Sequence, residues 1–122
     1  RFLRAALKNE PITIYGKGDQ TRTFCYIEDN LETTSRILEK DLCMNDVINI
    51  GHDEEISVLE LAKKIISMTG SSSQLIHLPA LPEGDMTRRC PDNSKMKEIL
   101  GRQLTSLEKG IQMMTEYYKT GK

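Results

Sequence analysis

The chain has 122 residues, enough for one modest domain with a core and too few for two ordinary ones. Hydrophobic residues make up 38% and charged residues 29%, and the formal net charge of −1 gives no overall basic field that would favour nucleic acid or an acidic membrane surface. No apolar run approaches the roughly 20 residues that cross a bilayer, and no signal-peptide pattern opens the chain.

Cysteine and histidine usage argues against a disulfide framework and against a metal site. Cys25, Cys43 and Cys90 are odd in number and never form a C-x-x-C pair, and His52 and His77 are isolated. This pattern favours reduced thiols, and therefore a cytoplasmic setting. We expect no bound metal.

The first predicted element is a helix over residues 2–9. It ends before Pro11, because proline disfavours a helical conformation in the residue before it. The chain opens at Arg1 already in helical pattern, so we expect a piece of a longer protein. The β-branched residues 12–15 predict a strand, and after a glycine-containing loop residues 23–27 predict a second one.

The next helix is predicted over residues 30–40. Asp29 and Glu32 have the spacing of a capping box, which places Asp29 at the N-cap. The apolar residues Leu31, Ile37 and Leu38 are then expected to face the core.

A strand–helix–strand unit is predicted over residues 46–78. "DVINI" (46–50) is typical of a strand, Ser57 and Glu60 form a second capping box, and Gly70 ends the helix. With a further strand over 74–78, the spacing predicts parallel neighbours joined by a right-handed crossover.

Two more helices complete the pattern. Asp92 is expected to cap a helix that stops at Gly101, and Thr105 with Glu108 to cap the last helix, whose inner face would hold Ile111, Met114 and Tyr118. The fold class is therefore α/β with a parallel sheet, and the strands are too few to complete such a sheet. We expect the remainder upstream.

The loop "YGKGDQTR" (15–22) is the candidate site for phosphate. It is not a Walker P-loop, since the lysine is not followed by Ser or Thr, and it lacks the third glycine and the following helix of a dinucleotide fingerprint. One reading is a strand connection in which Gly16 and Gly18 adopt positive φ. The other is that Arg22 binds a pair of phosphate oxygens.

Four stretches carry a resemblance to a known family. "PITIYGKGDQTRTFCYIEDN", "VINIGHDEEISVLELAKKI", "LPEGDMTRRCPDNSKMKEILG" and "SLEKGIQMMTEYY" resemble the C-terminal half of extended short-chain dehydrogenases/reductases that act on nucleotide sugars. The family includes NDP-sugar epimerases, dTDP-glucose 4,6-dehydratases and UDP-glucuronate decarboxylases. The resemblance implies that residues 1–122 are a single substrate-binding segment of an NAD(P)-binding Rossmann-type enzyme, with an incomplete sheet and without the N-terminal dinucleotide-binding part.

The resemblance also implies a site for a UDP- or dTDP-sugar. Arg22 stands where the family contacts the diphosphate, with Gln20 and the turn at Tyr15 beside the nucleotide. A segment that closes over the nucleotide end in relatives matches Asp85, Arg88 and Arg89.

The chain departs from the family pattern in one respect: many epimerases and dehydratases place an arginine three residues before the Asp85 position, where this chain has Pro82. Two other features favour the decarboxylase branch. The Arg88–Arg89 pair and the run "TRTFCYIED" are more similar to UDP-glucuronate decarboxylases. A dTDP-glucose 4,6-dehydratase or an NDP-sugar 4-epimerase remains an alternative.

The catalytic machinery of the family is not expected in these residues. Relatives use NAD, held by a glycine-rich turn, and a tyrosine base in a Tyr-x-x-x-Lys helix. Tyr118 and Lys122 have that spacing but lie in the C-terminal tail, out of context. We therefore expect no catalytic residue and no NAD bound by this chain alone, with NAD the cofactor of the parent enzyme.

A non-enzymatic α/β binding module is the second alternative, from a different functional class. Upstream sequence with a Gly-x-x-Gly-x-x-Gly turn would favour the enzyme. An exposed sheet edge and apolar faces should drive association, so we expect a homo-oligomer. Neither nucleic acid nor a membrane is an expected partner.

Overall fold

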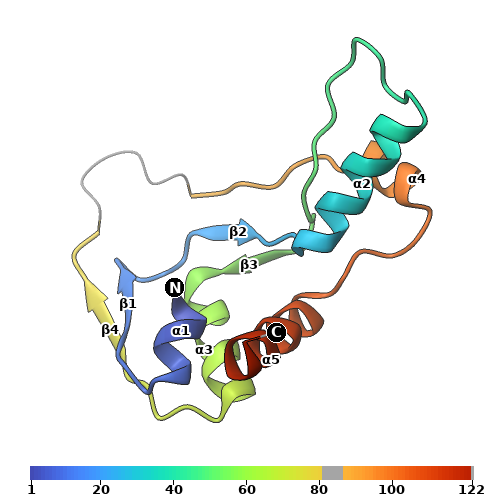
Figure 1. The fold of residues 1–122 in the computed structure, drawn as a ribbon. Helices are drawn as coiled ribbons and strands as arrows, with labels where there is room; N and C mark the ends of the chain where they lie inside the picture. Colours follow the sequence, from blue (N-terminus) through green and yellow to red (C-terminus); the bar gives the residue numbers. More distant parts are fainter. Residues whose placement is uncertain (81–86, 122) are drawn as a thin grey trace. The chain divides into compact units, whose positions relative to one another are not determined.

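The computed structural model describes residues 1–80 and 87–121 (Figure 1). These residues belong to two compact units. Unit 1 contains Arg1–Arg22, Ile56–Arg89 and Ile111–Lys122, and unit 2 contains Thr23–Glu55 and Cys90–Gly110. In the described part, no helix is both long enough and apolar enough to cross a membrane.

Helices and short strands are interspersed along the chain and two strands pair in parallel, which confirms the predicted α/β class. They are α1 (Phe2–Leu7), β1 (Ile12–Tyr15), β2 (Thr21–Thr23), α2 (Ile27–Glu39), β3 (Glu55–Ser57), α3 (Val58–Thr69), β4 (Leu75–Leu78), α4 (Ser94–Leu100) and α5 (Leu107–Thr120).

Unit 1 is built on a parallel pair of strands, β1 and β4, in which Ile12 is paired with Leu75 and Tyr15 with Leu78. Because side chains alternate along a strand, Ile12 and Ile14 point to the same face, and both are only 1% exposed. Helices α1 and α3 pack against each other and against β1. The apolar core of this unit consists of Leu3, Ala6, Ile12, Ile14, Leu61, Ala62, Ile65 and Ile111.

The capping box of α3 is confirmed. Glu60 N–H donates to Ser57 Oγ at 3.1 Å, and Ser57 N–H donates to Glu60 Oε2 at 3.1 Å. Gly70 ends the helix in the left-handed conformation, with φ of 64°. Both ends of α3 are therefore encoded locally.

Unit 2 contains α2 and α4, and hydrogen bonds from Arg36 of α2 connect the two helices. Its Nη1 donates to the carbonyls of Ile99 and Leu100 at 3.0 and 2.9 Å, which satisfies acceptors that the end of α4 leaves open. Met96 and Leu100 are buried here beside polar groups. The buried polar residues of the described part of unit 2 are Asp29, Thr33 and Asn93.

The predicted parallel partner of the strand at 74–78 was wrong. Residues 46–50 do not form a strand, and β4 pairs with β1 instead. The sequence pattern of 46–50 is that of a strand, but a strand also needs a neighbour with which to exchange hydrogen bonds.

The boundaries and faces of α2 also differ from the prediction. The second strand covers residues 21–23 rather than 23–27, and α2 begins at Ile27. Asp29 is not the N-cap, because its carboxylate binds a distant partner instead. Leu31 and Leu38, expected in the core, are 59% and 72% exposed.

The two C-terminal helices begin later than predicted. The N-cap of α4 is Asn93, while Asp92 Oδ1 accepts from Ser94 N–H at 3.0 Å. Before α5, Ser106 Oγ rather than Thr105 accepts from a first-turn N–H. Of the three residues predicted for the inner face of α5 only Ile111 is buried, since Met114 and Tyr118 are 43% and 45% exposed.

Candidate functional site

The glycine loop of unit 1 is shaped by packing. Gly16 and Gly18 have φ of 62° and 79°, the positive values expected from the sequence. A Cβ on Gly18 would lie 2.9 Å from Ile14 Cγ2 and 3.0 Å from Leu59 Cβ. A side chain at position 18 is therefore excluded both by the backbone angle and by its neighbours.

Carbonyl groups of the glycine loop accept hydrogen bonds from the first N–H groups of α3. Val58 N–H donates to Gln20 O and Leu59 N–H donates to Gly18 O, both at 3.1 Å. With Glu60 N–H bound by Ser57, the first three N–H groups of α3 are occupied. A helix that begins after a glycine turn holds a pyrophosphate through open N–H groups, so the N-terminus of α3 does not form the cradle of a dinucleotide such as NAD.

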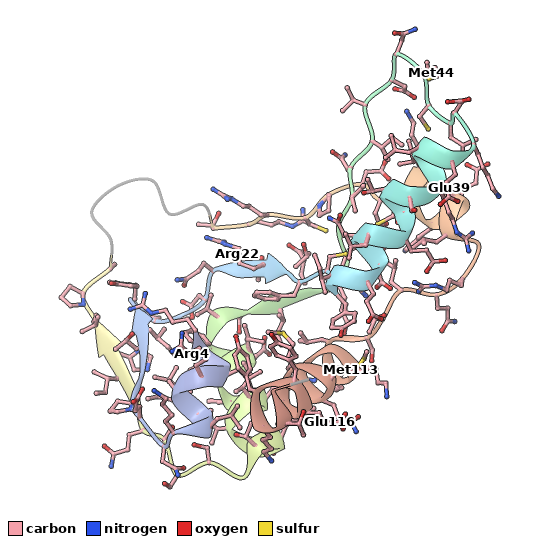
Figure 2. The ribbon with its side chains drawn as sticks, viewed as in Figure 1. Arg4, Arg22, Glu39, Met44, Met113 and Glu116 are labelled. Carbon is pink, nitrogen blue, oxygen red and sulfur yellow. The ribbon has the colours of Figure 1, made fainter. Side chains whose placement is uncertain are left out.

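One hydrogen bond brings together the side chains that are candidates for a phosphate contact. Thr21 N–H donates to Thr87 O at 2.9 Å. Arg22 follows the first of these residues and Arg88 and Arg89 follow the second, so the three arginines stand on adjacent backbone segments. Arg22, labelled on β2 in Figure 2, is half-buried, and its Nη1 donates to Thr21 O at 2.7 Å.

The turn after β1 brings two more predicted residues together. Gln20 Nε2 donates to Tyr15 O at 3.5 Å, and Gly16 N–H continues the β1–β4 ladder by donating to Leu78 O at 2.9 Å. His77 Nδ1 lies 2.8 Å from Gly16 O, a neighbour that the sequence did not indicate because the β1–β4 pairing was not predicted. Asp85 lies outside the described residues, so its predicted role stays a prediction.

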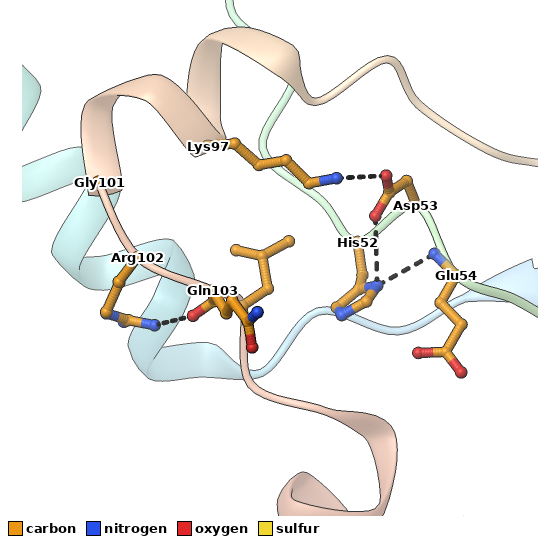
Figure 3. A pocket seen from close by; sticks show the side chains of 8 residues that line it. His52, Asp53, Glu54, Lys97, Gly101, Arg102 and Gln103 are labelled. Carbon is orange, nitrogen blue, oxygen red and sulfur yellow. Dashed lines mark hydrogen bonds and ion pairs between the residues drawn. The ribbon is translucent and has the colours of Figure 1, made fainter.

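Unit 2 contains a pocket of about 670 Å³ that several charged side chains line (Figure 3). Its charges are largely paired with one another. Lys97 Nζ lies 2.5 Å from Asp53 Oδ2, and this hydrogen bond holds the pKa of Asp53 below its ordinary value. Glu54 N–H donates to His52 Nδ1 at 3.0 Å, so a neutral His52 ring carries its proton on Nε2. The lining residues are His52, Asp53, Glu54, Lys97, Gly101, Arg102, Gln103 and Leu104.

A buried carboxylate lies beside this pocket, also in unit 2. The Asp29 side chain is 0% exposed and accepts from Thr105 N–H at 2.7 Å, Thr105 Oγ1 at 2.9 Å and Arg102 Nη2 at 2.9 Å. Burial alone would raise the pKa of Asp29, but these hydrogen bonds outweigh burial and hold it below its ordinary value. The hydrogen bond from Arg102 likewise lowers the pKa of Glu32. Because both carboxylate oxygens of Asp29 accept hydrogen bonds from the protein, we interpret this cluster as structural.

Comparison with known proteins gives concordant matches. A family model described as GDP-mannose 4,6 dehydratase matches residues 1–114. The chain is 34% identical over 125 residues to UDP-N-acetyl-alpha-D-glucosaminuronate decarboxylase from Bacillus cytotoxicus, covering 98% of this chain and 39% of that protein. It is also 34% identical to UDP-glucuronic acid decarboxylase 1 from Danio rerio, covering 96% of this chain and 28% of that protein.

The fold agrees with solved structures. UDP-glucuronic acid 4-epimerase from Bacillus cereus, in complex with UDP-glucuronic acid and NAD, matches with a TM-score of 0.84 and 32% identity, over 100% of this chain and 39% of that chain. The predicted fold, part of a Rossmann-type extended short-chain dehydrogenase/reductase with an incomplete sheet, is confirmed. The chain spans two fifths or less of the length of these relatives.

Proposed function

We propose a function that proceeds from one premise: this chain belongs to the GDP-mannose 4,6 dehydratase family. Residues 1–122 are the nucleotide-sugar-binding segment of a larger NAD-dependent enzyme. The substrate is a nucleotide-diphosphate sugar, and the reaction of the parent enzyme is the decarboxylation of UDP-glucuronate or a closely related UDP-sugar acid. Support comes from the names of two relatives, both decarboxylases of UDP-linked sugar acids.

The binding site is built on the arginines of unit 1. Arg22 binds the diphosphate, because a planar guanidinium can donate hydrogen bonds to two phosphate oxygens at once. Arg88 or Arg89 adds a second positive charge from the adjacent segment. The observation that supports this assignment is the hydrogen bond between Thr21 N–H and Thr87 O, which sets the two segments side by side.

Three further residues complete the proposed site at the nucleotide. Gln20 and Tyr15, which share a hydrogen bond, lie in the turn beside Arg22. Asp85 belongs to the segment that leads to Arg88.

NAD and the catalytic base belong to the part of the parent enzyme outside these 122 residues. Within the described residues the glycine loop offers carbonyls to α3 rather than N–H groups to a pyrophosphate. The chain alone is therefore an inactive binding segment. Its setting is the cytoplasm, as the cysteine usage suggests.

A second candidate is epimerisation of the same substrate. The Bacillus cereus neighbour is a UDP-glucuronic acid 4-epimerase, 32% identical to this chain, so a parent that epimerises UDP-glucuronate is the main competitor. Product analysis of a full-length parent with UDP-glucuronate and NAD separates the two, because decarboxylation releases CO2 and leaves a UDP-pentose, whereas epimerisation keeps the carboxylate.

Titration of the chain with UDP, followed by NMR chemical shifts, tests the binding site. We expect weak binding that Arg22→Ala reduces at least about tenfold, since a hydrogen bond to a charged group contributes about 1.5–3 kcal/mol. Arg22→Lys keeps the charge but loses the planar fork and should fall between the two. Arg4→Ala, a change at an exposed arginine of α1, is the matched control. Equal affinities of Arg22→Ala and Arg4→Ala would show that the assignment is wrong.

A further inference from the structure

The first residue of the glycine loop is held by the strand beside it. Strands β1 and β4 lie side by side and parallel, and β1 leads directly into Gly16 (Figure 1). Gly16 N–H donates to Leu78 O at 2.9 Å, and His77 Nδ1 lies 2.8 Å from Gly16 O. Both backbone polar groups of Gly16 are therefore bound by β4.

The contact with Gly16 decides where the His77 ring carries its proton. A carbonyl oxygen can only accept a hydrogen bond, so Nδ1 of His77 must be protonated and must donate to Gly16 O. The other histidine of the chain has the opposite arrangement, since Nδ1 of His52 accepts from Glu54 N–H. The two rings therefore have different tautomers when neutral, and only His77 uses Nδ1 as a donor.

The hydrogen bond from His77 holds one end of the loop. The bonded carbonyl belongs to the peptide that joins Gly16 to Lys17, and Gly16 has φ of 62°, a region that glycine adopts without steric cost. The other end is held by α3, whose first N–H groups donate to Gly18 O and Gln20 O. His77 thus fixes the start of the loop, and α3 fixes its end.

The residues of the proposed nucleotide site lie on this loop and at its ends. Tyr15 O accepts from Gln20 Nε2 at 3.5 Å, a long hydrogen bond that holds the loop only weakly by itself. Arg22 follows Gln20 by two residues. Rotation of the peptide after Gly16 would change the path of the chain between Tyr15 and Gln20, and the bond from His77 opposes that rotation.

The exit from β4 also lies against this glycine. A Cβ at position 16 would be 3.4 Å from Ala80 Cβ, so the loop begins in contact with the segment that leads on to Arg88. The His77 ring itself is exposed and adds little to the apolar core. Its hydrogen bond is therefore better suited to orienting the loop than to stabilising the fold.

We propose that His77 is a positioning residue of the nucleotide site: its Nδ1–H fixes the Gly16 carbonyl and thereby keeps Gln20 and Arg22 in the geometry that binds the diphosphate. The inference rests on the proposed function. His77 acts through the loop and does not itself contact the ligand. It raises the fraction of molecules whose loop is competent to bind, and the apparent affinity rises with that fraction.

Titration with UDP, followed by NMR chemical shifts, compares three variants of the chain. His77→Leu removes the donor and should weaken binding about threefold to tenfold, the effect of one neutral hydrogen bond. His77→Asn should restore most of the affinity, because its amide nitrogen is as many bonds from the backbone as Nδ1 and also donates. Gln74→Leu, at an exposed residue just before β4, is the matched control. Equal affinities of His77→Leu and Gln74→Leu, or no recovery in His77→Asn, would overturn the proposal.

Signals of the protein alone test the same bond without a ligand. The NMR shifts of the ring nitrogens should show a protonated Nδ1 in the neutral His77 ring, and a proton on Nε2 would overturn the proposal. The Lys17 amide shares its peptide with the Gly16 carbonyl, so its signal should move in His77→Leu and return in His77→Asn. The urea midpoint should stay the same in all variants. A large drop in His77→Leu would show a structural role and overturn positioning.

The two proposals fail in different ways. If Arg22→Ala weakens the binding of UDP and His77→Leu does not, the positioning role alone is overturned. If the chain does not bind UDP although the Lys17 amide responds to His77→Leu, the proposed function is overturned and the hold of His77 on the loop stands.

Discussion

Replacement of Asp29 by alanine should destabilise the chain more than any exposed carboxylate could. Its side chain is 0% exposed and accepts three hydrogen bonds, two from Thr105 and one from Arg102. Arg102 is 39% exposed, so water can replace its bond to Asp29. Thr105 is only half-buried, but its N–H and its hydroxyl both bind this carboxylate and both lose their acceptor together.

The magnitude follows from the Thr105 pair. A hydrogen bond to a charged group contributes about 1.5–3 kcal/mol, and a buried donor left without an acceptor costs about 1–3 kcal/mol. We therefore expect Asp29→Ala to lower the free energy of unfolding by about 3 kcal/mol, a large share of the typical 5–15 kcal/mol. Thr105→Val, which removes the hydroxyl and keeps the N–H bond, should cost about 1 kcal/mol.

Urea unfolding followed by circular dichroism measures these differences. Asp19→Ala, at an exposed acid of the glycine loop, is the control and should stay within about 0.5 kcal/mol of the parent. The exchange rate of the Thr105 amide reports on the bond itself and should rise in Asp29→Ala. If Asp29→Ala and Asp19→Ala unfold at the same urea concentration, the reasoning from burial and hydrogen bonding is refuted.

Two further predictions concern pH and the glycine loop. The pKa values of Asp29 and Glu32 are lowered by folding, so the stability these groups add is present above their unfolded pKa values and is lost as pH falls through the folded ones. The urea midpoint should therefore fall between about pH 5 and pH 2, and less steeply in Asp29→Asn; a parallel fall in both would contradict this. Gly18→Ala should destabilise by about 2–3 kcal/mol, because strain at φ of 79° adds to a clash with Ile14 and Leu59. Gly101→Ala, where φ is 64° and no neighbouring atom lies within 4 Å of the new Cβ, should cost about 1 kcal/mol, and equal costs in urea unfolding would show that packing at position 18 is unimportant.

Local signals in the sequence were sufficient for the elements whose ends are encoded nearby. The capping box of Ser57 and Glu60 and the stop at Gly70 define α3, and the β-branched run 12–15 is β1. Each depends on residues within a few positions of one another, where backbone geometry and side-chain chemistry decide the outcome.

The predictions that the structure contradicts concern residues whose environment depends on parts of the chain that are distant in sequence. The spacing of Asp29 and Glu32 indicates a capping box, yet Thr105, 76 residues later, binds the carboxylate. The polarity of Leu31 and Leu38 predicts a place in the core, whereas α2 buries Asp29 and Thr33 and exposes both leucines. Residues 46–50 have the pattern of a strand, but no strand of the described part of the chain pairs with them.

The candidate site shows the same division. The sequence singled out Arg22 and the Arg88–Arg89 pair through a family resemblance, but the bond from Thr21 to Thr87 that relates them spans 66 residues. The position of His77 beside the turn at Gly16 follows from the register in which β1 pairs with β4, so the spacing of residues in the sequence does not predict it.

The two units interleave along the chain, and this arrangement limits how the protein can be divided. Five stretches alternate between the units, so the backbone passes from one to the other four times. Division of the chain at a single position therefore leaves neither unit intact. In addition, the hydrogen bonds of β1 can form only after β4, some 60 positions later in the sequence, has come beside it. Such long-range pairing slows folding. Recombination or domain exchange would therefore preserve these 122 residues only as an indivisible block.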